Sequence, residues 1–95
     1  MTQTRKDDGT TTKPHVAFYT KPGCHLCEAA KLEIERAACQ GRYTFEEVNI
    51  ESDAALLKQY GWEIPVVVIN GTIVFKYRLT TQEFKREIER YSKTA

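Results

Sequence analysis

Residues 19–27 have the sequence YTKPGCHLC, and this stretch carries the strongest signal for the fold of the chain. Val16 to Thr20, a segment that overlaps the start of this stretch, is short, aromatic and β-branched, which predicts a strand. From Cys24 to about Cys39, apolar residues recur at helical spacing and predict a helix. A strand, a tight Pro-Gly turn and a helix therefore place two cysteines at the start of that helix.

The spacing of Cys24 and Cys27 puts both side chains on one face of the predicted helix. Cys24 falls at the N-cap or in the first turn, where unpaired backbone N–H groups and a partial positive charge stabilise a thiolate. Lys21 and His25 add positive charge nearby. Cys27 lies one turn further in and is expected to be more buried. An exposed thiolate that attacks and a protected thiol that resolves are what a dithiol redox catalyst needs.

Zinc binding is the main competing interpretation of a CxxC pair, but a structural zinc site usually has four ligands. The other candidate ligands are His15, His25 and Cys39. Cys39 follows Cys27 by a whole helix, which separates the two by roughly 18 Å at 1.5 Å per residue. We therefore expect a redox dithiol and no metal within one chain. Two alternatives stay open: a metal or iron–sulfur cluster shared between two chains, and a non-catalytic interaction domain.

The rest of the chain supplies three further strands and two helices. A strand from Tyr43 to Ile50 precedes a short helix with Ser52 as its N-cap, which ends at Tyr60 before Gly61. Asn70-Gly71 is a strong hairpin signal because both turn positions need positive φ. It joins the apolar strand Ile64 to Ile69 to a return strand, Thr72 to Tyr77.

The last helix has two start signals. Thr80 and Glu83 form a capping box, and Leu79 can pack against Phe84 as a hydrophobic staple. The element order is therefore β-α-β-α-β-β-α. This order predicts an α/β fold, a four-stranded mixed sheet flanked by helices on both faces.

Composition limits the classes of function. The 95 residues carry 14 Lys and Arg against 13 Asp and Glu, a formal charge of +1 that argues against nucleic-acid binding. No apolar run approaches the roughly 20 residues of a membrane span, and the N-terminus has no apolar signal core. Three cysteines are too few for a disulfide-stapled secreted scaffold. These features predict a cytoplasmic protein. We expect residues 1–14 to form a flexible tail and residues 15–95 to form one domain.

The element order, the Lys21-Pro-Gly-Cys24-x-x-Cys27 motif and the Ile64-Pro65 pair ahead of a hairpin resemble glutaredoxins of the thioredoxin-fold superfamily. The phrase GCHLCE is most similar to the small glutaredoxin-like proteins. The resemblance implies the thioredoxin-like fold and a thiol–disulfide oxidoreductase that contributes to cell redox homeostasis. It implies that no cofactor is tightly bound and that glutathione serves as a co-substrate. It also implies a monomer whose partner is a disulfide-containing protein or a glutathione mixed disulfide.

The resemblance also assigns roles to residues. Cys24 matches the attacking cysteine and Cys27 the resolving one, while Lys21 matches a lysine that holds a glutathione carboxylate. Pro65 matches a cis-proline that faces the dithiol, and the Ile64 backbone would pair with the substrate backbone. Sequence alone leaves both the cis and the trans form of the Ile64–Pro65 bond open.

Two segments depart from the glutaredoxin pattern. His25-Leu26 stands where glutaredoxins commonly have Pro-Tyr. Residues 76–81, KYRLTT, replace a Gly-Gly and an acidic residue that grip the γ-glutamyl end of glutathione. Thr80 and Thr81, at the start of the last helix, could still bind a carboxylate there.

Several other residues are expected to have only structural roles. Cys39 is expected to be a small buried side chain. Trp62 and Tyr19 are expected to pack in the core or at its rim rather than to form the floor of a substrate groove. The charged residues of the first helix are expected to form a solvent-exposed face: Glu28, Lys31, Glu33 and Glu35.

Overall fold

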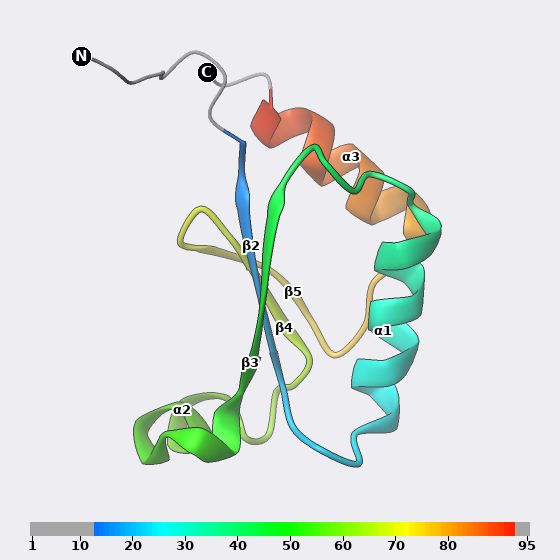
Figure 1. The fold of residues 1–95 in the computed structure, drawn as a ribbon. Helices are drawn as coiled ribbons and strands as arrows, with labels where there is room; N and C mark the ends of the chain where they lie inside the picture. The colour runs from blue at the N-terminus through cyan, green and yellow to red at the C-terminus, as the bar shows by residue number, and fades with distance from the viewer. Residues whose placement is uncertain (1–12, 93–95) are drawn as a thin grey trace, which may run out of the picture.

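The computed structural model describes residues 13–92, which form a single four-stranded sheet with helices packed against it (Figure 1). The strands run in the order β3-β2-β4-β5 across the sheet. The central strand β2 pairs parallel with β3 and antiparallel with β4, and β4 pairs antiparallel with β5. The bounds are β2 His15–Thr20, α1 His25–Arg36, β3 Thr44–Asn49, η2 Ile50–Ser52, α2 Ala54–Tyr60, β4 Val66–Ile69, β5 Thr72–Lys76 and α3 Thr81–Ser92. The predicted order of elements and the mixed four-stranded sheet are confirmed.

The main core lies between the sheet and the helices α1 and α3, which cover the same face (Figure 1). Alternate residues of β2 point into this layer, so Val16 and Phe18 are fully buried. From the helices, Ile34, Phe84 and Ile88 fill the other side of the layer. Burial of these side chains is the main force that holds α1 and α3 on the sheet.

The short helix α2 lies at the end of the sheet at which β2 and β3 finish (Figure 1). Tyr60, its last residue, packs against Tyr19 with ring centroids 4.7 Å apart. Tyr19 alternates with Phe18 along β2, so this contact is on the face opposite α1 and α3. Helices therefore flank both faces as predicted, although α2 covers only one end of its face.

Two helix ends differ from the sequence prediction. Helix α1 ends at Arg36 rather than near Cys39, because Ala38 takes a left-handed φ of 55° that a helix cannot continue through. The N-cap of α2 is Asp53 rather than Ser52, since the Asp53 carboxylate accepts the Ala55 N–H at 2.8 Å. The Ser52 hydroxyl instead donates to the carbonyl of Asn49.

The local signals near the C-terminus are confirmed. Asn70 and Gly71 both have positive φ, 50° and 85°, in the tight turn between β4 and β5. The capping box of α3 is complete: the Glu83 carboxylate accepts the Thr80 N–H, and the Thr80 hydroxyl accepts the Glu83 N–H, each at 3.1 Å. Strand β4 begins at Val66, two residues later than predicted.

At the N-terminal boundary, Pro14 is already part of the fold. Its side chain is buried, and its carbonyl accepts the Thr44 N–H at 2.9 Å. Residues 1–12 of the predicted flexible tail lie outside the described residues. Within residues 13–92, none of the helices has the length and apolar character needed to cross a membrane.

Candidate active site

Cys24 and Cys27 form a disulfide at the start of α1, with their Cα atoms 5.2 Å apart. Cys24 is the N-cap residue of the helix and has extended backbone angles, as the turn before it requires. Its Sγ accepts a hydrogen bond from the Cys27 N–H at 3.2 Å. The first cysteine is therefore held where free helix N–H groups stabilise negative charge on sulfur.

The two cysteines differ in exposure. Cys27 is 3% exposed and belongs to the hydrophobic core, next to Ala30 and Ile34 on the inner face of α1. Cys24 is only partly buried and packs at the edge of that core. After reduction, a partner molecule can approach the Cys24 sulfur directly, whereas Cys27 is shielded by the helix and the sheet.

The Ile64–Pro65 peptide bond is cis. The sequence alone left both the cis and the trans form open, and the resemblance implied the cis form. Pro65 is buried, and its carbonyl accepts the Tyr77 N–H at 2.8 Å. Val66 pairs with Tyr19 in the antiparallel register. Pro65 therefore lies at the end of the sheet from which the Cys24 turn departs.

An open pocket of about 440 Å³ lies beside the disulfide on its β3 side. Both cysteines line it, together with Lys21 from the turn and Glu47 and Asn49 from β3. The structure thus brings Lys21 together with the dithiol. It does not do so for His25, whose side chain is 95% exposed and lies 3.8 Å from Glu28. Ile64 and Pro65 do not line this pocket.

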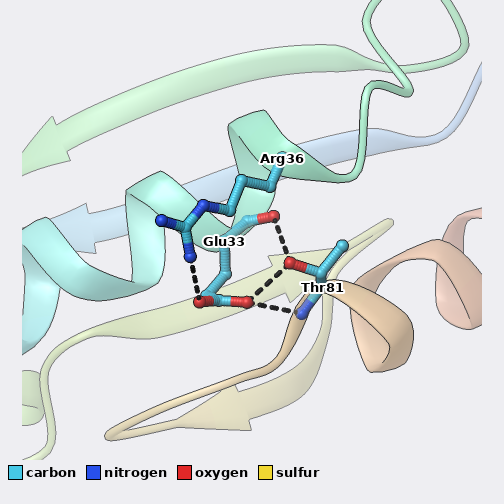
Figure 2. Close-up of polar contacts among 3 residues, drawn as sticks. All are labelled: Glu33, Arg36 and Thr81. Carbon is cyan, nitrogen blue, oxygen red and sulfur yellow. Dashed lines mark hydrogen bonds and ion pairs between the residues drawn. The ribbon is translucent and has the colours of Figure 1, made fainter.

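The expectation of a solvent-exposed charged face on α1 is wrong for Glu33. Its carboxylate accepts hydrogen bonds from the Thr81 hydroxyl at 2.6 Å and the Thr81 N–H at 2.8 Å (Figure 2). Arg36 lies 3.4 Å from its other oxygen. The two hydrogen bonds from Thr81 hold the pKa of Glu33 below its ordinary value.

This contact also changes the expectation for the start of α3. The sequence left Thr80 and Thr81 available for the carboxylate of a ligand. In the structure, the internal carboxylate of Glu33 takes the Thr81 donors, and Glu83 takes the Thr80 N–H. The prediction that the charged residues of α1 face solvent also fails in part for Lys31. Its Nζ pairs with the Glu47 carboxylate on β3 at 2.8 Å. Helical spacing alone cannot reveal such partners, because they come from elements far apart in the chain.

Two expectations about single residues have opposite outcomes. Cys39 is 3% exposed in the core, as predicted. Trp62 was expected to pack, yet it is 93% exposed in the turn between α2 and β4. No group of three or more metal-ligating side chains gathers within residues 13–92.

Comparisons with known proteins agree with this geometry. Residues 15–89 match the family described as Glutaredoxin-like domain (DUF836). A relative from Dictyostelium discoideum, the glutaredoxin-like protein YDR286C homolog, is 31% identical over 81 residues, which cover 79% of this chain and 75% of the relative.

Solved structures show the same fold. A structural-genomics target protein from X. campestris superposes with a TM-score of 0.68 at 24% identity, over 79% of this chain and 96% of its own. A thioredoxin variant from Halobacterium salinarum gives 0.65 at 20% identity, over 90% of this chain and 80% of its own. The family match over most of its length shows that the chain belongs to the glutaredoxin-like domain family, and the solved structures show that its fold is thioredoxin-like.

Proposed function

We propose that the protein is a thiol–disulfide oxidoreductase that uses Cys24 and Cys27 to reduce disulfides or mixed disulfides. The observation that carries the proposal is the unequal exposure of two cysteines close enough to bond. Family membership and the α1 N-cap position of Cys24 support it.

The proposed reaction begins with the reduced dithiol. The Cys24 thiolate attacks one sulfur of a substrate disulfide, a mixed disulfide forms, and the other substrate sulfur leaves as a thiolate that takes up a proton. Cys27 then loses its proton and attacks the Cys24 sulfur. This step releases the second substrate thiol and leaves the Cys24–Cys27 disulfide. The substrate gains two electrons and the protein loses two.

Substrate contacts belong to the same proposal. The Ile64 backbone, next to Pro65, pairs with the backbone of a protein substrate as an added strand. Lys21, which lines the pocket beside the dithiol, provides positive charge near Cys24. We propose a disulfide-containing protein or a glutathione mixed disulfide as the partner. In this scheme the protein is a cytoplasmic monomer with no tightly bound cofactor that contributes to cell redox homeostasis.

Of these two partners, the contacts of Glu33 favour the protein disulfide. A γ-glutamyl carboxylate at the start of α3 would have to displace Glu33 from Thr81. An extended protein segment next to Ile64 needs no such displacement.

The test compares the turnover of a protein disulfide with that of a glutathione mixed disulfide, under one external reductant. We expect turnover of the protein disulfide and its complete loss in Cys24→Ser. Cys39→Ser is the matched control, because Cys39 is buried away from the pocket that the dithiol lines. Equal activity of Cys24→Ser and the wild-type protein would remove the proposed function.

A further inference from the structure

A groove runs between α1 and β3 and leads away from the dithiol. Its near end is the pocket of about 440 Å³ that the two cysteines line, with Glu47 and Asn49 on the β3 side. Its far end is a second open pocket of about 390 Å³, which Ile34 and Phe45 line. Lys31 lines both pockets, so the two are neighbours along one groove, which we call the α1–β3 groove.

The chemistry of the groove changes along its length. Ile34, Tyr43 and Phe45 give the far pocket an apolar floor, with polar residues at its exposed rim. Phe45 is 40% exposed although its side chain is large and apolar. Between the two ends, the Lys31 ammonium group and the Glu47 carboxylate lie 2.8 Å apart, and each side chain is 42% exposed. The groove therefore presents an apolar site, then a charged pair, then the two sulfurs.

The free edge of β3 borders this groove. The sheet order leaves β3 with a neighbouring strand on one side only among residues 13–92. The Thr44 N–H donates to the carbonyl of Pro14, so the backbone groups of Thr44 point toward the β2 side. Backbone groups alternate in direction along a strand, so those of Phe45 and Glu47 point outward. Unpaired N–H and C=O groups at a sheet edge are a template for a further strand, so the occupant that fits is an extended chain.

The register of β3 sets the spacing of the two pockets. Phe45, Glu47 and Asn49 lie on the α1 side of the sheet, since Phe45 pairs in register with Val16 and Glu47 with Phe18. From Phe45 in the far pocket to Asn49 in the near one is four positions of strand, about 13 Å at 3.3 Å per residue. An extended chain beside β3 therefore reaches both pockets with residues four positions apart, and these two side chains point the same way.

A second copy of this chain is a poorer occupant than a separate protein segment. If two β3 strands paired antiparallel over their centres, Glu46 of each copy would lie opposite Glu47 of the other. Like charges directly opposite one another destabilise a sheet. A segment of a substrate protein has no such restriction, and the reaction at the near end already requires a disulfide-containing chain to approach.

From these observations we infer that the α1–β3 groove binds an extended segment of the substrate protein in which an apolar residue stands four positions from the reactive cysteine. The inference rests on the proposed function, because it names the class of protein disulfide for that reaction. The apolar side chain fills the far pocket, the residue midway faces the Lys31–Glu47 pair, and the backbone pairs with Phe45 and Glu47. The chain on the other side of the reactive cysteine pairs with Ile64.

The test uses synthetic peptides whose single cysteine forms a mixed disulfide with thionitrobenzoate, a coloured leaving group. The Cys24 thiolate attacks the peptide sulfur and the coloured thiolate leaves. Cys27 then attacks the Cys24 sulfur, which releases the peptide thiol and forms the Cys24–Cys27 disulfide. Two test peptides carry a leucine four positions from the cysteine, one before it and one after it. Control peptides carry the leucine three positions away, where an extended chain directs it out of the groove, or carry alanine instead.

The measured quantity is the second-order rate constant of colour release at low peptide concentration, with protein reduced beforehand by dithiothreitol. One of the two peptides with leucine at four positions should react about threefold to tenfold faster than the alanine peptide, the effect of half-burying a leucine side chain. The peptides with leucine at three positions should match the alanine peptide. Equal rate constants for all the peptides would overturn the inference.

Phe45→Thr tests the far pocket. It keeps a β-branched residue on the edge strand and removes the aromatic ring, so the advantage of leucine should disappear while the alanine peptide reacts as with the wild-type protein. Ile73→Thr is the matched control, because Ile73 is 44% exposed on the other edge strand and lines neither pocket. The full leucine advantage in Phe45→Thr would show that the inference is wrong. If Phe45→Thr does not fold, the peptide series on the wild-type protein decides the inference by itself.

Two further outcomes have separate meanings. A dimer in solution that Phe45→Thr converts to a monomer would place a second copy in the groove and reject the inference. Colour release from the alanine peptide by the wild-type protein but not by Cys24→Ser, with no advantage for leucine, rejects the groove and leaves the oxidoreductase intact. Release from none of the peptides, or equal release by Cys24→Ser, rejects the oxidoreductase and the inference with it.

Discussion

Cys24 and Cys27 are chemically identical side chains that lie in different surroundings. Cys24 is the N-cap of α1, half-buried, with a helix N–H directed at its sulfur. Cys27 lies one turn later against the sheet, 3% exposed. The difference comes from position along one helix face, because Cys24 lies at the open end of the helix and Cys27 lies one turn further in, over the core.

The first prediction concerns the order in which the reduced thiols react. We expect iodoacetamide at neutral pH to modify Cys24 at least about tenfold faster than Cys27, because the thiolate is the reactive form and exposure controls access. Mass spectrometry of timed samples measures the two rates. Cys39, buried in the core, is the internal reference for an inaccessible thiol. Faster labelling of Cys27 would contradict the assigned roles.

The second prediction separates attack from resolution. In Cys27→Ser, Cys24 can still attack a substrate disulfide, but no thiol remains to release the product. A covalent mixed disulfide with the substrate should therefore accumulate and be visible by non-reducing electrophoresis. Cys24→Ser should form none. An adduct in Cys24→Ser and none in Cys27→Ser would reverse the roles of the two cysteines.

At the scale of the elements, the contact between Glu33 and Thr81 joins the middle of the chain to its end. The Glu33 carboxylate, on α1, takes the backbone and side-chain donors of Thr81 at the first turn of α3 (Figure 2). Negative charge is favourable at a helix N-terminus, and Arg36 balances it from the other side. The angle between α1 and α3 is therefore fixed by polar contacts as well as by the core.

The third prediction is the pH dependence of this contact. The pKa of Glu33 is lower in the folded chain than its ordinary value of 4.5, first because of the Thr81 hydroxyl. The stabilisation is therefore complete above about pH 5.5 and is lost as the pH falls below 4.5 through the folded value. Glu33→Gln should be less stable at neutral pH and should show a flatter decline of the unfolding temperature below pH 5.

The control for this prediction is Glu35→Gln, an exposed carboxylate on the same helix. It should keep the wild-type profile between pH 3 and 7, an interval of about four units chosen to span ordinary carboxylate pKa values. Differential scanning calorimetry at each pH measures the midpoint. Identical profiles for Glu33→Gln and the wild-type protein would show that the Thr81 contact contributes nothing to stability.

Over the whole molecule, aromatic side chains range from fully buried to almost fully exposed. Phe84 is fully buried between α3 and the sheet, and its ring meets Tyr43 edge-on at 5.4 Å. Trp62 is 93% exposed near the end of the sheet that carries the dithiol. The core on the α1 and α3 side therefore holds the fold, and the turn before β4 is free to contact other molecules.

The fourth prediction compares these two residues. Phe84→Ala should lower the free energy of unfolding by about 3–5 kcal/mol, because it removes buried surface and leaves a cavity. Trp62→Ala should change it by less than about 0.5 kcal/mol. Urea titrations followed by circular dichroism, with the disulfide intact in each protein, measure both values. A large loss in Trp62→Ala would mean that the tryptophan packs against the fold.

The sequence by itself determined the order of elements, the placement of Cys24 at the N-cap or in the first turn of its helix, the Asn70-Gly71 turn and the capping box at Thr80. These features depend on neighbours within a few residues, so hydrophobic period and turn chemistry encode them directly. Only the tertiary structure decided that Glu33 caps α3, that Lys31 pairs with Glu47, and that Thr20 faces a pocket beside the dithiol. Each of these depends on which segments the sheet order and the helix packing bring together. Residues separated by 48 positions, like Glu33 and Thr81, share no local pattern.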